Sequence, residues 1–103
     1  PLSGERLNLF KLQTMHFEVA DTERFPSLRL AYEAIEIGGN MPCILNAAGE
    51  IANSAFRHER IAFYQIPAII EKTMQTATYD ASSSLETYLT TDSEARRIAT
   101  SLI

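Results

Sequence analysis

The stretch MPCILNAAGEIANSAFR, residues 41–57, is the most regularly patterned part of this sequence and decides its fold class. Its apolar residues recur at intervals of three and four, which places them on one face of an α-helix. They are Met41, Ile44, Leu45, Ala48, Ile51, Ala52, Ala55 and Phe56. Asn40 is the predicted N-cap, and Pro42 suits the first turn of the helix. The segment therefore predicts an amphipathic helix whose apolar face needs neighbours.

The opposite face of this helix carries a polar stripe, which we define as Asn46, Glu50, Asn53 and Arg57. Two interpretations are open. The stripe is either the solvent side of an amphipathic helix, or Asn46 and Glu50 hydrogen-bond a neighbouring backbone segment such as residues 17–21. Two adjacent alanines permit close approach and favour the second. Gly49 costs about 1 kcal/mol relative to alanine inside a helix, so it either serves close packing or has no packing role.

Further helices flank this segment on both sides. One is predicted over residues 25–37, with Gly38-Gly39 as its left-handed stop. Another is predicted over residues 65–77, after a briefly extended connection at residues 61–63. Two capping boxes then predict a short helix from Leu85 and a separate last helix, and Asp92 pairs with Arg96 on the latter. The boxes are Ser83 with Glu86 and Thr91 with Glu94. The fold class is mostly α, a small bundle of four or five helices.

The first predicted helix carries two apolar stripes instead of one. The first stripe is Phe25, Leu28, Tyr32 and Ile35, and the second is Leu30, Ala34 and Ile37. Two stripes indicate a helix that is covered from two directions. This helix is therefore either central in the bundle or docked on another domain.

Residues 1–24 differ from the rest of the chain. Turn-forming residues open them, and Met15, Phe17 and Val19 then alternate with less apolar residues, which predicts one half-buried extended segment. A lone strand cannot pair with itself, so it lies against the helices or belongs to a sheet elsewhere. The predicted organisation is an extended lead over residues 1–24 and a helical domain over residues 25–103.

Composition excludes several classes of function. The 103 residues carry a net charge of −4 with dispersed Arg and Lys, which argues against nucleic acid or an anionic membrane as partner. Cys43 is the only cysteine, so no internal disulfide forms; a buried, inert thiol in a reducing compartment is expected. No apolar run is long enough to cross a membrane. The sequence begins at Pro1 without a methionine, which predicts a fragment or a processed chain.

No set of residues in the sequence assembles a catalytic site. His16 and His58 have no spacing suited to zinc, and the Glu33–Glu36 pair lacks the histidine that di-metal bundles use. The glycines at 38–39 lack the spacing of a phosphate loop. We therefore assign no catalytic, cofactor-binding or metal-ligating residue in this chain.

The order of motifs resembles the C-terminal part of the 1-deoxy-D-xylulose 5-phosphate reductoisomerase family. The family pattern runs L-T-F-E-x-P-D, R-[FY]-P-x-L-x-L-A, G-G, L-N-A-A-N-E, [RQ]-I-x-F-x-[DE]-I and D-A-x-A-R. The matching segments here are residues 15–21, 24–31, 38–39, 45–50, 60–66 and 92–96. The departures from the pattern are Ala20 for Pro, Gly49 for Asn, Gln65 for an acid and Ser93 for Ala.

The resemblance implies a three-part enzyme of the bacterial cytoplasm that acts in non-mevalonate isoprenoid biosynthesis. It converts 1-deoxy-D-xylulose 5-phosphate to 2-C-methyl-D-erythritol 4-phosphate with NADPH and a divalent metal, Mg or Mn, as a homodimer. The family's catalytic, cofactor and metal residues lie upstream, so no cofactor is expected in this fragment, which is expected to be inactive alone.

Within that family, Asn46 and Glu50 belong to the motif and are expected to tie their helix to its neighbours. Leu30, Ala34 and Ile37 are expected to form an interdomain surface that meets the upstream catalytic domain of the same chain. The alternative function is a free-standing helical protein-interaction module.

Overall fold

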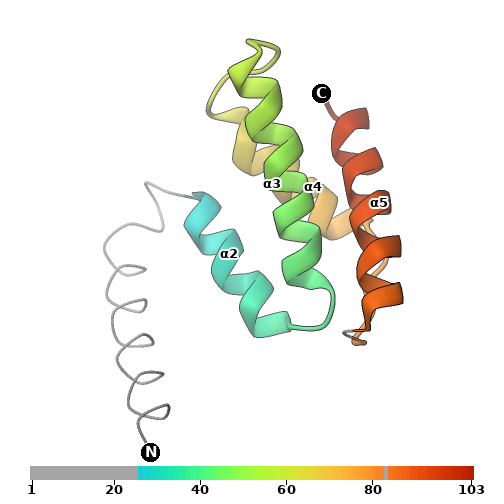
Figure 1. The fold of residues 1–103 in the computed structure, drawn as a ribbon. Coiled ribbons are helices and arrows are strands. Elements are labelled where there is room, and N and C mark those ends of the chain that lie inside the picture. The colour runs from blue at the N-terminus through green and yellow to red at the C-terminus, as the bar shows by residue number, and fades with distance from the viewer. Residues whose placement is uncertain (1–25, 83) are drawn as a thin grey trace, which may run out of the picture.

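The structure, a computed structural model, describes residues 26–82 and 84–103, which form a helical bundle. Its helices are α2 (Pro26–Ile37), α3 (Met41–Arg57), α4 (Gln65–Thr76) and α5 (Leu85–Ser101). Helices α3 and α4 each contact all of the other helices, α3 more extensively, whereas α2 and α5 make no contact with each other; α3 lies between α2 and α5 (Figure 1). No strand occurs in these two ranges, and the predicted mostly helical class is confirmed. The predicted lead, residues 1–24, lies outside the described residues.

The core is built around the apolar face of α3, as its periodicity predicts. Ile44, Ala48 and Ala52 of α3 are completely buried, and so are Ala95 and Ala99 of α5. Small side chains on both helices let the two backbones approach closely, which makes the contact between α3 and α5 the most extensive in the bundle. Isoleucines and Met74 of α4 close the core from behind.

Helix α2 packs into the core through the stripe that was expected to contact another domain. Leu30 and Ala34 are 1% and 0% exposed and pack in the core with α3 and α4. The prediction of an interdomain surface is therefore wrong for Leu30 and Ala34, while Ile37 is 49% exposed. In the other stripe, Ile35 is 64% exposed, whereas Leu28 and Tyr32 are half-buried. Both stripes have helical spacing, so periodicity alone could not decide which of them would be buried.

The two helices predicted after the polar loop are one continuous helix, α5. It begins at Leu85 as predicted, but its cap is Ser84, whose Oγ accepts a hydrogen bond from the Thr87 N–H at 3.2 Å. The proposed cap Ser83 lies outside the described residues. Thr91, the other predicted cap, lies inside α5 and is buried. The reason is that continuing a helix avoids the cost of nucleating a second one.

The connections differ from prediction in two places. Residues 61–63 form a bend and a turn, so the predicted short extended segment is wrong. Helix α4 begins at Gln65 as predicted, where the Ala62 N–H donates to the Gln65 side chain at 2.7 Å. Asn40 does occupy the N-cap position of α3, but its side chain makes no capping hydrogen bond.

The side chain of Asn40 instead forms what we call the Asn40 joint. Its Nδ2 donates to the Thr78 carbonyl and to the Thr91 hydroxyl, both at 2.9 Å. Its Oδ1 accepts from the Asp80 N–H at 2.9 Å. The residue is only 4% exposed, so these bonds satisfy an amide that water cannot reach. The joint ties the α2–α3 turn, the α4–α5 connection and α5 together.

The two glycines before the joint have different roles. Gly38 and Gly39 both have positive φ angles, 72° and 56°, which favour glycine. A Cβ on Gly38 would meet nothing within 4 Å. A Cβ on Gly39 would lie 2.6 Å from the Asp80 carbonyl oxygen, so the chains can approach at the joint only because Gly39 has no side chain.

These positions supply a matched pair of variants. Gly38→Ala is expected to lower the free energy of unfolding by about 1–2 kcal/mol, the cost of a left-handed alanine. Gly39→Ala is expected to lower it by a further 1–3 kcal/mol or so, because the added methyl group collides with backbone. Urea denaturation followed by circular dichroism measures both. Equal losses for the two variants would contradict the close approach at Gly39.

Candidate functional site

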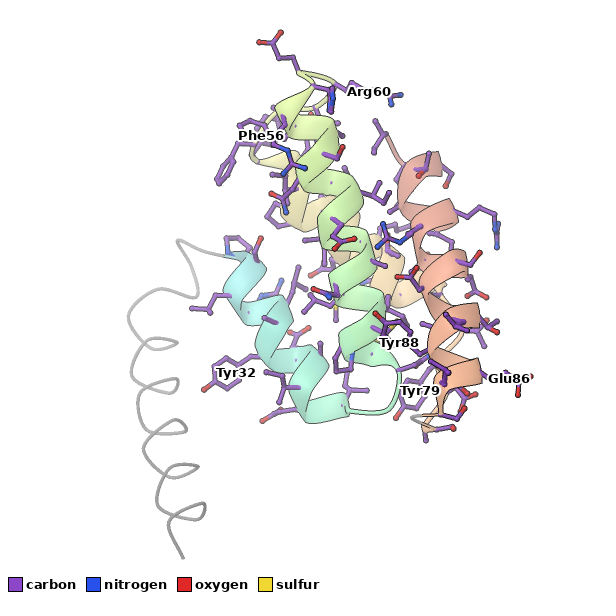
Figure 2. The ribbon with its side chains drawn as sticks, viewed as in Figure 1. Tyr32, Phe56, Arg60, Tyr79, Glu86 and Tyr88 are labelled. Atoms are coloured by element: carbon purple, nitrogen blue, oxygen red, sulfur yellow. The ribbon has the colours of Figure 1, made fainter. Side chains whose placement is uncertain are left out.

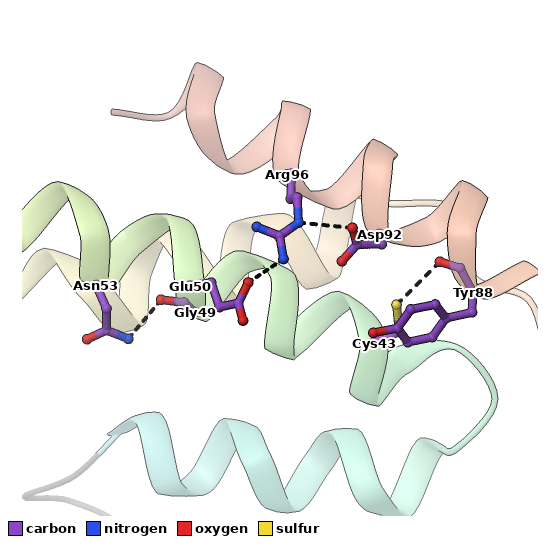
Figure 3. A network of polar contacts seen from close by, with 7 residues as sticks. All are labelled: Cys43, Gly49, Glu50, Asn53, Tyr88, Asp92 and Arg96. Atoms are coloured by element: carbon purple, nitrogen blue, oxygen red, sulfur yellow. Dashed lines mark hydrogen bonds and ion pairs between the residues drawn. The ribbon is translucent and has the colours of Figure 1, made fainter.

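The polar stripe forms the floor of an open groove of about 710 Å³. Ser27 and Ala31 of α2 line one side of the groove, and Arg96 of α5 lines the other. Glu50 and Asn53 face this space from α3, which lies between α2 and α5 (Figure 3). Because the groove is concave and brings polar side chains of α3 and α5 together, we consider it first as a candidate site.

Arg96 connects the groove to α5 through two carboxylates. Its Nε donates to Asp92 Oδ2 at 2.9 Å, which confirms the predicted pair on α5, and its Nη2 donates to Glu50 Oε2 (Figure 3). The hydrogen bonds that Arg96 donates, to Glu50 first and to Asp92 second, raise its pKa, so the guanidinium stays charged. The three side chains are partly exposed, and such pairs contribute only about 0–1 kcal/mol.

Glu50 therefore ties α3 to a neighbour, although its partner is a side chain of α5. The predicted backbone partner, residues 17–21, lies outside the described residues. Asn53 donates from Nδ2 to the Gly49 carbonyl of its own helix at 2.7 Å (Figure 3). Asn46 is exposed and has no hydrogen-bond partner within residues 26–82 and 84–103. Of the two motif residues, only Glu50 is thus seen to bridge helices.

Gly49 is not required by packing among the described residues. A Cβ at this position would lie 3.9 Å from Ile70 Cδ1, an ordinary van der Waals contact. The interpretation that Gly49 serves close packing is therefore wrong for this part of the chain. Its backbone is helical, so glycine brings only the entropic cost.

Gly49→Ala is accordingly expected to raise the free energy of unfolding by about 0.5–1 kcal/mol. The gain comes from reduced freedom of the unfolded chain, with the methyl group in contact with Ile70. Chemical denaturation measures it, and Gly39→Ala serves as a control of opposite sign. Destabilisation by Gly49→Ala would contradict the helical, uncrowded environment.

The nucleophile and base candidates of the described residues lie at opposite ends of α3. Cys43 is in its first turn, and His58 follows its last residue. A helix of 17 residues is about 25 Å long, so the two cannot act together. Burial first, and the charge of Asp92 second, raise the pKa of the Cys43 thiol, which disfavours the reactive thiolate. The His58 ring lies 2.8 Å from the Ser54 carbonyl, a local contact at the helix end.

The described residues offer neither a cluster of metal ligands nor a phosphate cradle at the glycine pair before α3. No group of three or more His, Cys, Asp or Glu side chains in these ranges could hold a metal ion. Glu33, a candidate from sequence, pairs with Arg29, which also binds Glu71 of α4. The space around Gly39 is filled by Asp80 and Tyr79, so the start of α3 offers no phosphate cradle. No described helix is long and apolar enough to cross a membrane.

Comparison with known proteins identifies the family. Residues 2–98 match the family model described as the DXP reductoisomerase C-terminal domain. The chain belongs to this family. DXP is 1-deoxy-D-xylulose 5-phosphate, so the resemblance seen in the motifs is confirmed.

The relatives are longer proteins of the same kind. The 1-deoxy-D-xylulose 5-phosphate reductoisomerase of Bacteroides thetaiotaomicron is 48% identical over 101 residues, which are 98% of this chain and 26% of the relative. That of Methylococcus capsulatus is 46% identical over 96 residues, 93% of this chain and 24% of the relative. The chain therefore spans about a quarter of the length of the curated relatives that it matches.

A solved structure shares the fold. The reductoisomerase from Zymomonas mobilis, in complex with NADPH, superposes with a TM-score of 0.75 at 48% identity. The match covers 80% of this chain and 22% of that one. The helical bundle thus belongs to the family described as the DXP reductoisomerase C-terminal domain and shares its fold with part of that enzyme.

Two sets of hydrogen bonds that hold this domain together were not predicted. Asn40 was expected to cap a helix, whereas its side chain forms the Asn40 joint. Arg96 was expected to pair only with Asp92, whereas Glu50, 46 residues away, binds the same guanidinium. The available signals were the amide side chain of Asn40 and the place of Glu50 in the family motif. Neither signal predicts the partner, because the partner is far away in the sequence.

Proposed function

We propose that this chain is the structural part of a full-length reductoisomerase that converts 1-deoxy-D-xylulose 5-phosphate to 2-C-methyl-D-erythritol 4-phosphate. NADPH supplies the reducing hydride, and a divalent Mg or Mn ion assists in the upstream catalytic part. The family match and the names of relatives about four times as long support this proposal. The NADPH in the Zymomonas mobilis complex supports the choice of cofactor.

The role of this chain within that enzyme is to buttress the catalytic part, and the chain alone is inactive. The observation that carries this proposal is the Asn40 joint. Asn40 and Thr91, two of the three buried polar residues, bond each other and so join the start of α3 to α5. The third, Thr73, bonds the Ile69 carbonyl of its own helix, so all three are used within the bundle. The candidate nucleophile and base, Cys43 and His58, lie a helix length apart.

The remaining organisation follows from the family resemblance. Residues 1–24 form the lead from the catalytic part, and residues 25–103 form the helical domain. The upstream catalytic domain is the direct partner, and the full-length enzyme is a homodimer of the bacterial cytoplasm. A free-standing interaction module is the weaker alternative, because the matched relatives carry this region as a quarter of a longer chain.

A direct assay tests the proposal. The full-length protein should oxidise NADPH in the presence of 1-deoxy-D-xylulose 5-phosphate and Mg²⁺ or Mn²⁺, and the 103-residue chain should not. In the full-length protein, Cys43→Ser and His58→Gln should each keep kcat within about twofold, because neither side chain touches reacting atoms. Turnover by the 103-residue chain, or an inactive full-length protein, would overturn the proposal.

A further inference from the structure

The groove above the polar stripe continues into an apolar pocket at the start of α2. The pocket has a volume of about 260 Å³ and is lined by Pro26, Phe63 and Pro67 among others. Ser27, Asn53 and Ile70 line both the pocket and the groove, so the two form one continuous surface. We call this surface the entry face and define it by Ser27, Asn46, Asn53, Phe56, Arg57 and Phe63.

The apolar half of the entry face is a pair of exposed aromatic rings. Phe56 and Phe63 are 40% and 69% exposed, and their ring centroids lie 5.4 Å apart in an edge-to-face arrangement. In Figure 2 the Phe56 side chain projects outward near the end of α3. Arg57 follows Phe56 directly. Aromatic side chains beside an arginine are the composition that marks the energetic centre of an interface.

The polar half of the entry face has the spacing of an extended peptide. Asn46 and Asn53 are two helical turns apart, which places them about 10.5 Å from each other along α3. Three residues of an extended chain cover about 10 Å. Asn53 donates to Gly49 and keeps its side-chain carbonyl as an acceptor, and Asn46 has both of its polar groups available within the described ranges. The two amides can therefore bind the backbone of one extended segment.

The position of the face within the fold indicates what covers it. Pro26, the first described residue, lines the apolar pocket, so the described bundle begins at this face. The matched relatives contain about three quarters of their length outside this region. Exposed aliphatic side chains also lie elsewhere in the bundle: Ile35 and Ile37 are at the far end of α2, and Leu85 and Leu89 are on α5, which makes no contact with α2.

We propose that the entry face binds the catalytic part of the same full-length protein. An extended backbone segment of that part hydrogen-bonds Asn46 and Asn53, and its apolar side chains cover Phe56 and Phe63. This inference rests on the proposed function, because it requires that a catalytic part exists in the native chain.

Cysteine footprinting of the full-length protein tests the inference. Ser27→Cys places a thiol on the entry face, and Ser93→Cys places one on α5; both serines are exposed and differ from cysteine by one atom. Trypsin cuts after Arg24, Arg29, Arg57, Lys72 and Arg96, so these two thiols and Cys43 fall in separate peptides. Mass spectrometry can then follow each thiol separately during reaction with N-ethylmaleimide.

The thiol at position 27 is expected to react about tenfold more slowly than the thiol at position 93, at a ratio independent of protein concentration. Phe63→Ser should speed the reaction at position 27 by about threefold by weakening the contact, whereas Leu89→Ser should leave it unchanged. Similar rates at positions 27 and 93 would overturn the inference. Protection that disappears on dilution would identify a second copy as the occupant and would also overturn it.

Activity measured on the same samples separates the two proposals. An active enzyme with an unprotected thiol at position 27 refutes the entry face alone. A protein with no NADPH-dependent turnover under any metal refutes the proposed function, whatever the labelling rates.

Discussion

The bundle depends on one buried amide, the side chain of Asn40. It bonds three groups in two segments that are far from it in the sequence: the Thr78 carbonyl and Asp80 N–H of the α4–α5 connection, and the Thr91 hydroxyl of α5. A buried polar group without partners costs about 1–3 kcal/mol, so a displacement of any bonded segment would lower the stability of the fold by a similar amount. The backbone N–H of Asn40 also donates to the Asp80 carbonyl at 2.8 Å, and Gly39 makes room for that approach. The joint thereby fixes where α5 meets the start of α3.

The fixed position of α5 has consequences for both faces of α3. On the inner face, alanines of α3 and α5 are buried in the same core, and such small side chains tolerate little displacement. On the outer face, Arg96 reaches Glu50 because α5 is held beside α3 (Figure 3). The contribution of this ion pair is small, since its groups are partly exposed. The polar stripe is therefore presented on a rigid helix, which suits a role in holding another part of an enzyme.

Sequence alone predicted what depends on local pattern. The bounds of α3 were right because its apolar residues repeat without interruption and a glycine pair precedes it. The orientation of α2 could not be predicted, since its two stripes are equally periodic and only the neighbours decide which is buried. The expected break between two helices at Thr91 was wrong, because α5 continues through this position. A capping pattern inside a helix does not end it when the flanking residues also favour the helix.

The same limit applies to the groove. The Asp92–Arg96 pair is four residues apart and was predicted, whereas the Glu50–Arg96 pair spans 46 residues and was not. That this chain holds no catalytic set stays a prediction; it was made because its two histidines and one cysteine have no catalytic or zinc-binding spacing. Family membership then followed from the order of the motifs, which no local physical signal supplies.

Replacement of the central amide tests most directly whether the fold rests on the Asn40 joint. Asn40→Ala should lower the free energy of unfolding, measured by urea denaturation, by about 2–4 kcal/mol, because buried partners at Asp80 and Thr91 lose their bonds. Thr76→Ala removes an exposed hydroxyl that bonds the Lys72 carbonyl of its own helix, and it should change the free energy by less than about 0.5 kcal/mol. Equal and small effects for the two variants would contradict the central role of the joint.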